Sequence, residues 1–202
     1  MSNVFAWLAQ SGVVQGIIIG ATLAFLTAIL VMDLVARSIT TTADGWSSIR
    51  RCGRPENGIL VRAACAKALP LVNVLEEAAY WTTARDGSGR RLSGMHEYVL
   101  HFPAGQLPPN HAFWSLTTTD AVGYMVANPT GRHSVGTRSE LARNADGSTD
   151  VYAGTTPPIG REDNWLPTPA GEFALMLRAY LPGEAILEGT YRVPEVREVH
   201  GR

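Results

Sequence analysis

Twenty consecutive residues near the start of the chain carry no charged side chain. This apolar stretch runs from Val13 to Met32. As an α-helix it would be about 30 Å long, which matches the hydrocarbon core of a bilayer. No basic segment precedes it and no small-residue cleavage site with a polar start follows it, which favours a retained membrane helix over a cleaved signal peptide. We therefore predict an N-terminal segment with a single transmembrane helix within residues 1–36.

Small side chains recur at every fourth position along this predicted helix. They are Gly12, Gly16, Gly20, Ala24 and Ala28. A four-residue spacing places them on one ridge, where a second helix can approach closely. Glycine and alanine are also common in membrane helices that make no such contact, so that interpretation stays open. In the lipid bilayer, the ridge predicts packing against an integral membrane protein or against a second copy of the helix.

The pattern changes after the apolar stretch. Residues 37–57 are polar and are broken by glycine and proline, which is typical of a linker or an irregular cover. Asn57 stands where a helix cap is expected, and helical spacing of apolar residues over 59–69 predicts a short helix. A second short helix is predicted over residues 71–79.

From Tyr80 onward apolar residues alternate with other residues, and turn signals recur at short intervals. Such alternation is typical of β-strands with one buried face. Eight strands are predicted, over residues 80–84, 96–102, 112–118, 123–127, 140–144, 149–154, 172–181 and 188–193. We therefore expect a mainly β fold over residues 58–200, an antiparallel jelly roll or β-sandwich with the helical segment before it.

Charge adds two constraints. The formal net charge is −1, the pI is about 6.5 and the chain has one lysine. No basic stripe with interleaved aromatic residues is present, so nucleic acid is not an expected partner. Arg37, Arg50 and Arg51 follow the apolar stretch, and the positive-inside rule then favours a cytoplasmic C-terminal part, although Asp33 opposes it.

The two cysteines, Cys52 and Cys65, leave two possibilities open. They form one disulfide if their side of the membrane is oxidising, or they stay free thiols near a helix.

One predicted strand carries an unusual polar face. Alternation over residues 172–181 places Met176, Arg178 and Tyr180 opposite an apolar face. The polar face of a central jelly-roll strand can be a concave ligand surface, where arginine and aromatic rings recognise a carboxylate or a sugar. The candidate ligand-binding residues are Trp114, Asp120, Asn128, Arg132, Arg178 and Tyr180, within a wider set that adds Arg138, Asn164 and Trp165.

Structural roles compete with these binding roles. Asp120 and Asn128 are typical caps of tight turns. Trp165 could close the end of a sandwich, and Arg178 could pair with Asp120.

No motif predicts a metal, a cofactor or a catalytic residue. His96 and His101 lie five residues apart, which is not the spacing of a convergent pair of ligands, and His111 and His133 fall near predicted loops. Ser134 follows His133 but lacks the GxSxG pattern of a nucleophile elbow. The acidic residues that could supply an acid–base pair are Asp120, Glu140, Asp150, Glu162 and Asp163, and their spacing sets no distance between them.

Four stretches together resemble a known family. They are YWTTARDGSGRRLSGMHEYVLHFPAGQLPP, FWSLTTTDAVGYMVANPTGRHSVGTRS, NADGSTDVY and NWLPTPAGEFALMLRAYLPGEAILEGTYRVPEV. Over about residues 57–196 the chain resembles the bacterial family called domain of unknown function 1214, here as a short form with a membrane anchor. The resemblance implies a jelly-roll fold and a globular part outside the cytoplasm, held at the inner membrane with the body in the periplasm. That placement conflicts with the charge rule.

Two functions follow as expectations. In the first, the protein is a single-pass accessory or binding subunit without catalysis. Its jelly roll would bind a partner or an envelope glycan, and its small-residue ridge would pack into a larger membrane complex. In the alternative, it is a carbohydrate-active hydrolase or lyase of the cell envelope. That alternative predicts that Asp120, Arg132 and Arg178 converge in one pocket.

Overall fold

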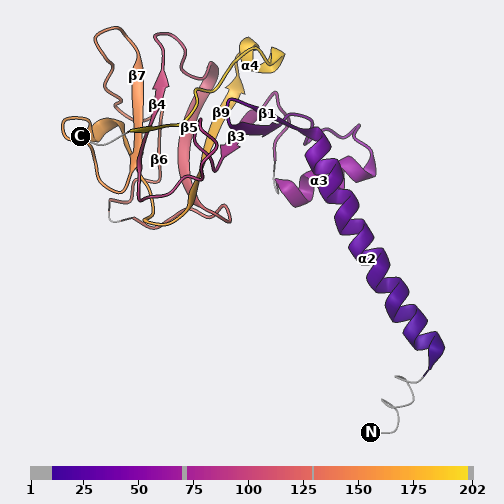
Figure 1. Cartoon of the computed structure of the whole chain (residues 1–202). Coiled ribbons are helices and arrows are strands. Elements are labelled where there is room, and N and C mark those ends of the chain that lie inside the picture. The colour runs from indigo at the N-terminus through magenta and orange to yellow at the C-terminus, as the bar shows by residue number, and fades with distance from the viewer. Residues whose placement is uncertain (1–10, 70–71, 129, 200–202) are drawn as a thin grey trace. The chain divides into compact units, whose positions relative to one another are not determined.

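A computed structural model describes residues 11–69, 72–128 and 130–199 of the 202-residue chain. The chain separates into two compact units (Figure 1). One unit contains two helices, and the other contains the strands. Each unit is described by itself below.

The first unit is built on helix α2, which spans Gly12–Ile39. The predicted apolar helix is therefore confirmed, and it continues beyond the uncharged stretch. It is long and apolar enough to cross a membrane. Large apolar side chains such as Leu23 and Phe25 are more than half exposed. Exposed apolar surface of this extent is unfavourable in water and normal in lipid.

Helix α3, Ile59–Ala68, packs against α2. Its N-cap is Gly58 and not Asn57, and Gly58 has no side chain that could cap the first turn. Lys67 Nζ lies 2.5 Å from Asp33 Oδ1 of α2. Both side chains are partly exposed, so this ion pair contributes at most about 1 kcal/mol. The second short helix predicted over residues 71–79 is wrong: residue 71 lies outside the described part, residues 75–77 form a turn, and Ala78 begins a strand.

The second unit contains two sheets. The larger sheet has six strands in the order β1-β2-β3-β9-β5-β6, all antiparallel. Its strands are β1 Thr40–Ala43, β2 Trp46–Ile49, β3 Ala78–Thr83, β5 Asn110–Asp120, β6 Ser134–Gly136 and β9 Phe173–Pro182. The smaller sheet has the order β10-β4-β7-β8, and β7 and β8 run parallel. Its strands are β4 Glu97–Phe102, β7 Thr149–Gly154, β8 Trp165–Pro167 and β10 Arg197–Val199.

One apolar cluster joins the two sheets. The ring of Tyr98 on β4 meets Phe173 on β9 edge to face at 5.8 Å, and Phe102 on β4 lies 5.7 Å from Trp114 on β5. Leu177, near the middle of β9, is fully buried. Burial of each such side chain stabilises the fold by about 1.5–3 kcal/mol. The expectation of a mainly β, two-sheet fold is confirmed, and the strand order is compatible with a jelly roll.

Three predicted strands are absent. Residues 123–127 follow a turn at residues 121–122 and form only one bridge, between Thr119 and Met125. Over residues 140–144 the backbone makes turn contacts and forms no strand. Over residues 188–193 helix α4, Glu184–Glu188, ends at Gly189, whose φ of 81° is the left-handed cap that glycine supplies. The three-residue strands β6, β8 and β10 were not predicted.

The segment predicted to be a linker contains a β-hairpin. Strands β1 and β2 are joined by Asp44 and Gly45, both with positive φ, which is the tight turn that an Asp-Gly pair favours. Trp46 is 2% exposed, and its indole N–H donates to the carbonyl of Pro194 at 2.8 Å. Arg50 donates to the carbonyls of Ile186 and Leu187 at the end of α4. The hairpin is therefore part of the second unit.

Replacing Trp46 by alanine tests this integration. We expect Trp46→Ala to destabilise the protein by about 3–5 kcal/mol, because it empties a buried site. The unfolding midpoint should fall by roughly 6–20 °C, measured by thermal unfolding of the full chain in detergent. Ser48→Ala on the same hairpin is the control and should have little effect. Equal midpoints for the two variants would show that the hairpin is not part of the folded body.

Candidate functional site

The central strand β9 determines which side chains emerge on the outer face of the six-stranded sheet. Its odd-numbered residues from Phe173 to Ala179 are buried. The intervening residues point outward and are paired with neighbours on both sides. Arg178 is opposite Tyr80 of β3 and Ser115 of β5. The face therefore collects residues from three strands that are far apart in sequence.

Two aromatic rings and an arginine form a stack on this face. The rings of Phe113 and Tyr180 are stacked, with centroids 4.4 Å apart and planes at 20°. The guanidinium carbon of Arg138 lies 4.7 Å from the centre of the Phe113 ring. An aromatic pair contributes about 0.5–1.5 kcal/mol, and an exposed cation–π contact about 0.5–1 kcal/mol. We call Phe113, Arg138, Arg178 and Tyr180 the arginine–aromatic face.

Both arginines of this face keep an uncompensated charge. Arg178 is half-buried, and its Nε donates to the sulfur of Met176 at 3.1 Å. Sulfur is a weak acceptor, so the remaining N–H groups of the guanidinium are available. Among the described residues, neither Arg178 nor Arg138 forms an ion pair with a carboxylate. The face therefore offers planar cationic donors suited to an anion.

A pocket of 290 Å³ adjoins these side chains. Its described lining includes Arg138, Arg178 and His133, together with serine hydroxyls, and contains no aspartate or glutamate. The volume is close to the lower end for small-molecule sites, about 300 Å³. Its electrostatics favour an anionic group over a neutral or cationic one.

Tyr80, a tyrosine beside the pocket, does not neutralise the positive charge of the arginines. Tyr80 donates from its hydroxyl to Asn73 Oδ1 at 2.6 Å. Burial raises the pKa of Tyr80, and the neighbouring Tyr180 raises it further, while Arg178 acts in the opposite direction. The phenol therefore stays protonated at neutral pH and does not neutralise Arg178.

The structure brings only part of the predicted residue set together. Arg178 and Tyr180 share the outer face, and Arg138 from the wider set joins them. Trp114 also borders the pocket, but its side chain is 4% exposed and its ring packs in the core against Phe102. Alternation along β5 turns Trp114 inward and Phe113 outward, so most of the Trp114 side chain belongs to the core.

Three predicted residues stabilise loops. Asp120 Oδ1 accepts from the backbone N–H groups of residues 122, 123 and 124, at 2.9, 2.8 and 2.9 Å. Asn128 Oδ1 accepts from the Thr130 hydroxyl at 2.7 Å. Arg132 donates to the carbonyls of Glu162 and Trp165 at 2.7 and 3.0 Å. Asp120, Arg132 and Arg178 therefore do not converge, and the hydrolase or lyase alternative lacks the carboxylates it needed in this pocket's described lining.

The rest of the wider set lies elsewhere. Asn164 is fully buried and donates to the carbonyls of Ala142, in a loop, and Asp150, in strand β7. Trp165 lines a different pocket, on the smaller sheet. His96 contacts Glu198 at 2.9 Å and His101 contacts Asp150 at 2.7 Å. Within residues 11–69, 72–128 and 130–199, no three histidine, cysteine or acidic side chains gather as a metal site would require.

Sequence reasoning missed Phe113 and Tyr80. Each lies within a predicted strand, so the alternation shows on which face of the sheet its side chain lies. The alternation does not show which residue of another strand it contacts. The pairing of β5 and β3 with β9 decides the contact, and that pairing joins residues about 65 to 100 positions apart.

The fold and this face define the class: a two-sheet β-protein with an arginine–aromatic outer face, joined in sequence to a helix able to span a membrane. Residues 77–184 match the family model described as protein of unknown function (DUF1214). This is more than half of the chain, which therefore belongs to the DUF1214 family.

Two solved structures are similar to the chain. The VPA0106 protein from Vibrio parahaemolyticus is 30% identical, with a TM-score of 0.61 over 72% of this chain. A putative uncharacterized protein from Burkholderia cenocepacia is 14% identical, with a TM-score of 0.40 over 87% of this chain. The chain spans 36% of the first protein and 49% of the second. No protein with a curated description matches the chain.

The cap made by Asp120 predicts a pH-dependent stability. Backbone hydrogen bonds, chiefly from Tyr124, hold the pKa of Asp120 below its ordinary value of 3.8. The carboxylate therefore stabilises the fold above that value, and this contribution is lost as the pH falls below it. Asp120→Ala should lower the unfolding midpoint at about pH 6, and the difference from the native chain should shrink towards about pH 3. Glu140→Ala, at an exposed site, is the control. A difference that does not change with pH would contradict the assigned cap.

Proposed function

We propose that this protein is a single-pass, membrane-anchored binding subunit without catalysis. Its β-body recognises an anionic group, a carboxylate or a phosphate, on a molecule of the cell envelope. Its helix packs through the small-residue ridge into a larger membrane assembly. The observation that carries the proposal is the pair of arginines beside stacked aromatic rings and a pocket with no acidic residue in its described lining.

The geometry supports binding because the face is held in place before any ligand arrives. The Phe113–Tyr180 stack and the cation–π contact fix two rings and one guanidinium. Preorganised groups lose little side-chain entropy on binding. A planar guanidinium can hold a carboxylate or a phosphate through two parallel hydrogen bonds.

The membrane role rests on helix α2. Among residues 11–69, 72–128 and 130–199, no other group lies within 4 Å of the position that a Cβ atom at Gly12, Gly16 or Gly20 would fill. This side of the helix therefore has room for close approach by another helix, as small-residue ridges allow. The proposed partner is an integral membrane protein or a second copy of this helix.

Placement of the body outside the cytoplasm is supported by the cysteines. Cys52 and Cys65 are both disulfide-bonded. Disulfides persist in oxidising compartments such as the periplasm and are rare in the cytosol. The disulfide-bonded cysteines outweigh the positive-inside rule, which favoured the cytoplasm. One of the arginines counted by that rule, Arg50, donates to carbonyls of α4 within the folded body.

The anion site is tested by titrating the full chain, in a nonionic detergent without phosphate or sulfate. The probes are trigalacturonate, for carboxylates, and glycerol 3-phosphate, for phosphates. Arg178→Gln should weaken binding of the preferred probe by about tenfold or more, since a hydrogen bond to a charged group contributes about 1.5–3 kcal/mol. Added salt should also weaken binding.

The matched control is Arg143→Gln, which removes an exposed arginine that is not among the described residues lining the pocket. Its affinity should equal that of the native chain. The anion proposal fails if neither probe binds, or if both arginine variants lose the same affinity.

The helix ridge is tested separately. The double variant Gly16→Leu with Gly20→Leu should lose its membrane partner, because two leucines prevent close helix approach. The measurement is quantitative mass spectrometry of proteins that co-purify in mild detergent, with cross-linking to detect a second copy. Ala21→Leu changes a small residue off the ridge and should leave the partner bound. If the double variant still co-purifies with the same membrane partner, the proposed packing through the small-residue ridge is wrong.

A further inference from the structure

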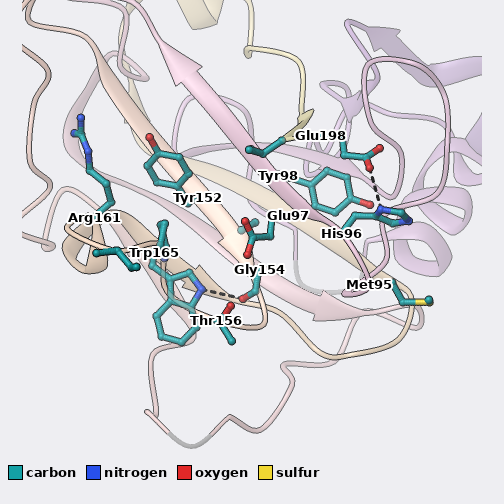
Figure 2. Close-up of a pocket in the computed structure, with 14 residues that line it drawn as sticks. Met95, His96, Glu97, Tyr98, Tyr152, Gly154, Thr156, Arg161, Trp165 and Glu198 are labelled. Carbon is teal, nitrogen blue, oxygen red and sulfur yellow. Dashed lines mark hydrogen bonds and ion pairs between the residues drawn. The ribbon is translucent and has the colours of Figure 1, made fainter. Parts of the chain in front are cut away.

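The smaller sheet carries a second pocket, which is larger than the first. It has a volume of 740 Å³ and lies over β4, β7 and β8 (Figure 2). Pockets of about 300–1,000 Å³ are the usual size for small-molecule sites. None of its described lining residues belongs to the pocket of the arginine–aromatic face. It is therefore a separate candidate site.

Two aromatic side chains form one side of this pocket. Tyr152 of β7 and Trp165 of β8 are register partners, so their side chains emerge on the same face of the sheet. The indole N–H of Trp165 donates to the carbonyl of Gly154 at 2.9 Å, as Figure 2 shows. This bond fixes the ring and satisfies its polar atom, which leaves the aromatic surface for contact.

The floor of the pocket is open because Gly154 has no side chain. A Cβ atom at this position would meet Glu97 Cγ at 3.5 Å and the carbonyl of Thr156 at 3.6 Å. These are ordinary contact distances, and the φ of Gly154 is not in the left-handed region. Alanine would therefore fit the fold, and its methyl group would lie against Glu97 in the lining of the pocket.

The charges of the pocket are nearly balanced. Glu198 contacts His96 at 2.9 Å and also pairs with Arg90. Arg161 donates to Asn144 Oδ1 at 2.9 Å. Glu97 is exposed, and no partner for its carboxylate is found among the described residues. The pocket thus offers aromatic surface, one available carboxylate acceptor and a guanidinium donor, without a strong net charge.

From this combination we infer that the pocket binds a neutral saccharide. A sugar ring has an apolar C–H face that can stack on the indole of Trp165 or the phenol of Tyr152. Its hydroxyl groups can donate to Glu97 and accept from Arg161. A charged ligand would gain little net attraction here, because the described lining holds both carboxylates and a guanidinium group. The inference does not depend on the anion site, which lies on the other sheet.

The test uses the full chain in phosphatidylcholine nanodiscs, because glycoside detergents would themselves compete for the pocket. The probes are maltotriose and tri-N-acetylchitotriose, with saturation-transfer NMR and calorimetry as readouts. At least one probe should bind the native chain. Gly154→Ala should weaken that binding by about tenfold or more, which corresponds to about 1.4 kcal/mol. Glu97→Gln, at an exposed and unpaired position, should also weaken it.

The controls separate this site from the rest of the molecule. Gly171→Ala adds the same methyl group where nothing lies within 4 Å, and it should leave binding unchanged. Arg178→Gln should also leave it unchanged, since Arg178 belongs to the other pocket. The inference is overturned if neither probe binds at up to about 10 mM, which is well above a millimolar Kd. It is equally overturned if binding survives both pocket variants, or if Arg178→Gln abolishes it.

Discussion

Burial of one face of strand β9 is the constraint on which the β-body depends. Phe173, Leu175, Leu177 and Ala179 are essentially inaccessible to solvent. A slip of one residue in register would turn this whole set outward and bury Arg178 in its place. Burying an arginine without a partner costs several kcal/mol, so the register is strongly specified. The same constraint that builds the core therefore also selects which side chains form the arginine–aromatic face.

The polar residues of the body divide into two groups. Those in loops satisfy backbone groups: Asp120 caps a turn and Arg132 joins carbonyls of a neighbouring segment. Those on the outer faces of strands, such as Arg178 and Glu97, keep their charge without an ion-pair partner among the described residues. Because their charged groups stay available at a pocket, these positions and not the loop residues carry the proposed binding roles.

The sequence was sufficient for features that depend on local pattern. An uncharged run predicts helix α2, and alternation predicts β3, β4, β5, β7 and β9, as well as the outward direction of Arg178 and Tyr180. Local pattern did not predict short strands that form through contacts with residues distant in the sequence. Strand β6 forms against β5, and β10 forms against β4, although each has only three residues. The Asp44-Gly45 pair favours a tight hairpin turn, but it lies in a polar segment whose composition predicts a linker. The partners of Phe113 and the floor at Gly154 depend on strand pairing, which local pattern does not specify.

Two sheets packed face to face leave two outward surfaces, and each carries its own pocket. If both proposed ligands bind, the body is bivalent, because the two pockets lie on different sheets. When two determinants belong to one polymer, engagement of the first raises the effective concentration of the second, and weak individual contacts become a durable attachment. When they belong to different polymers, the same body becomes a cross-link between them.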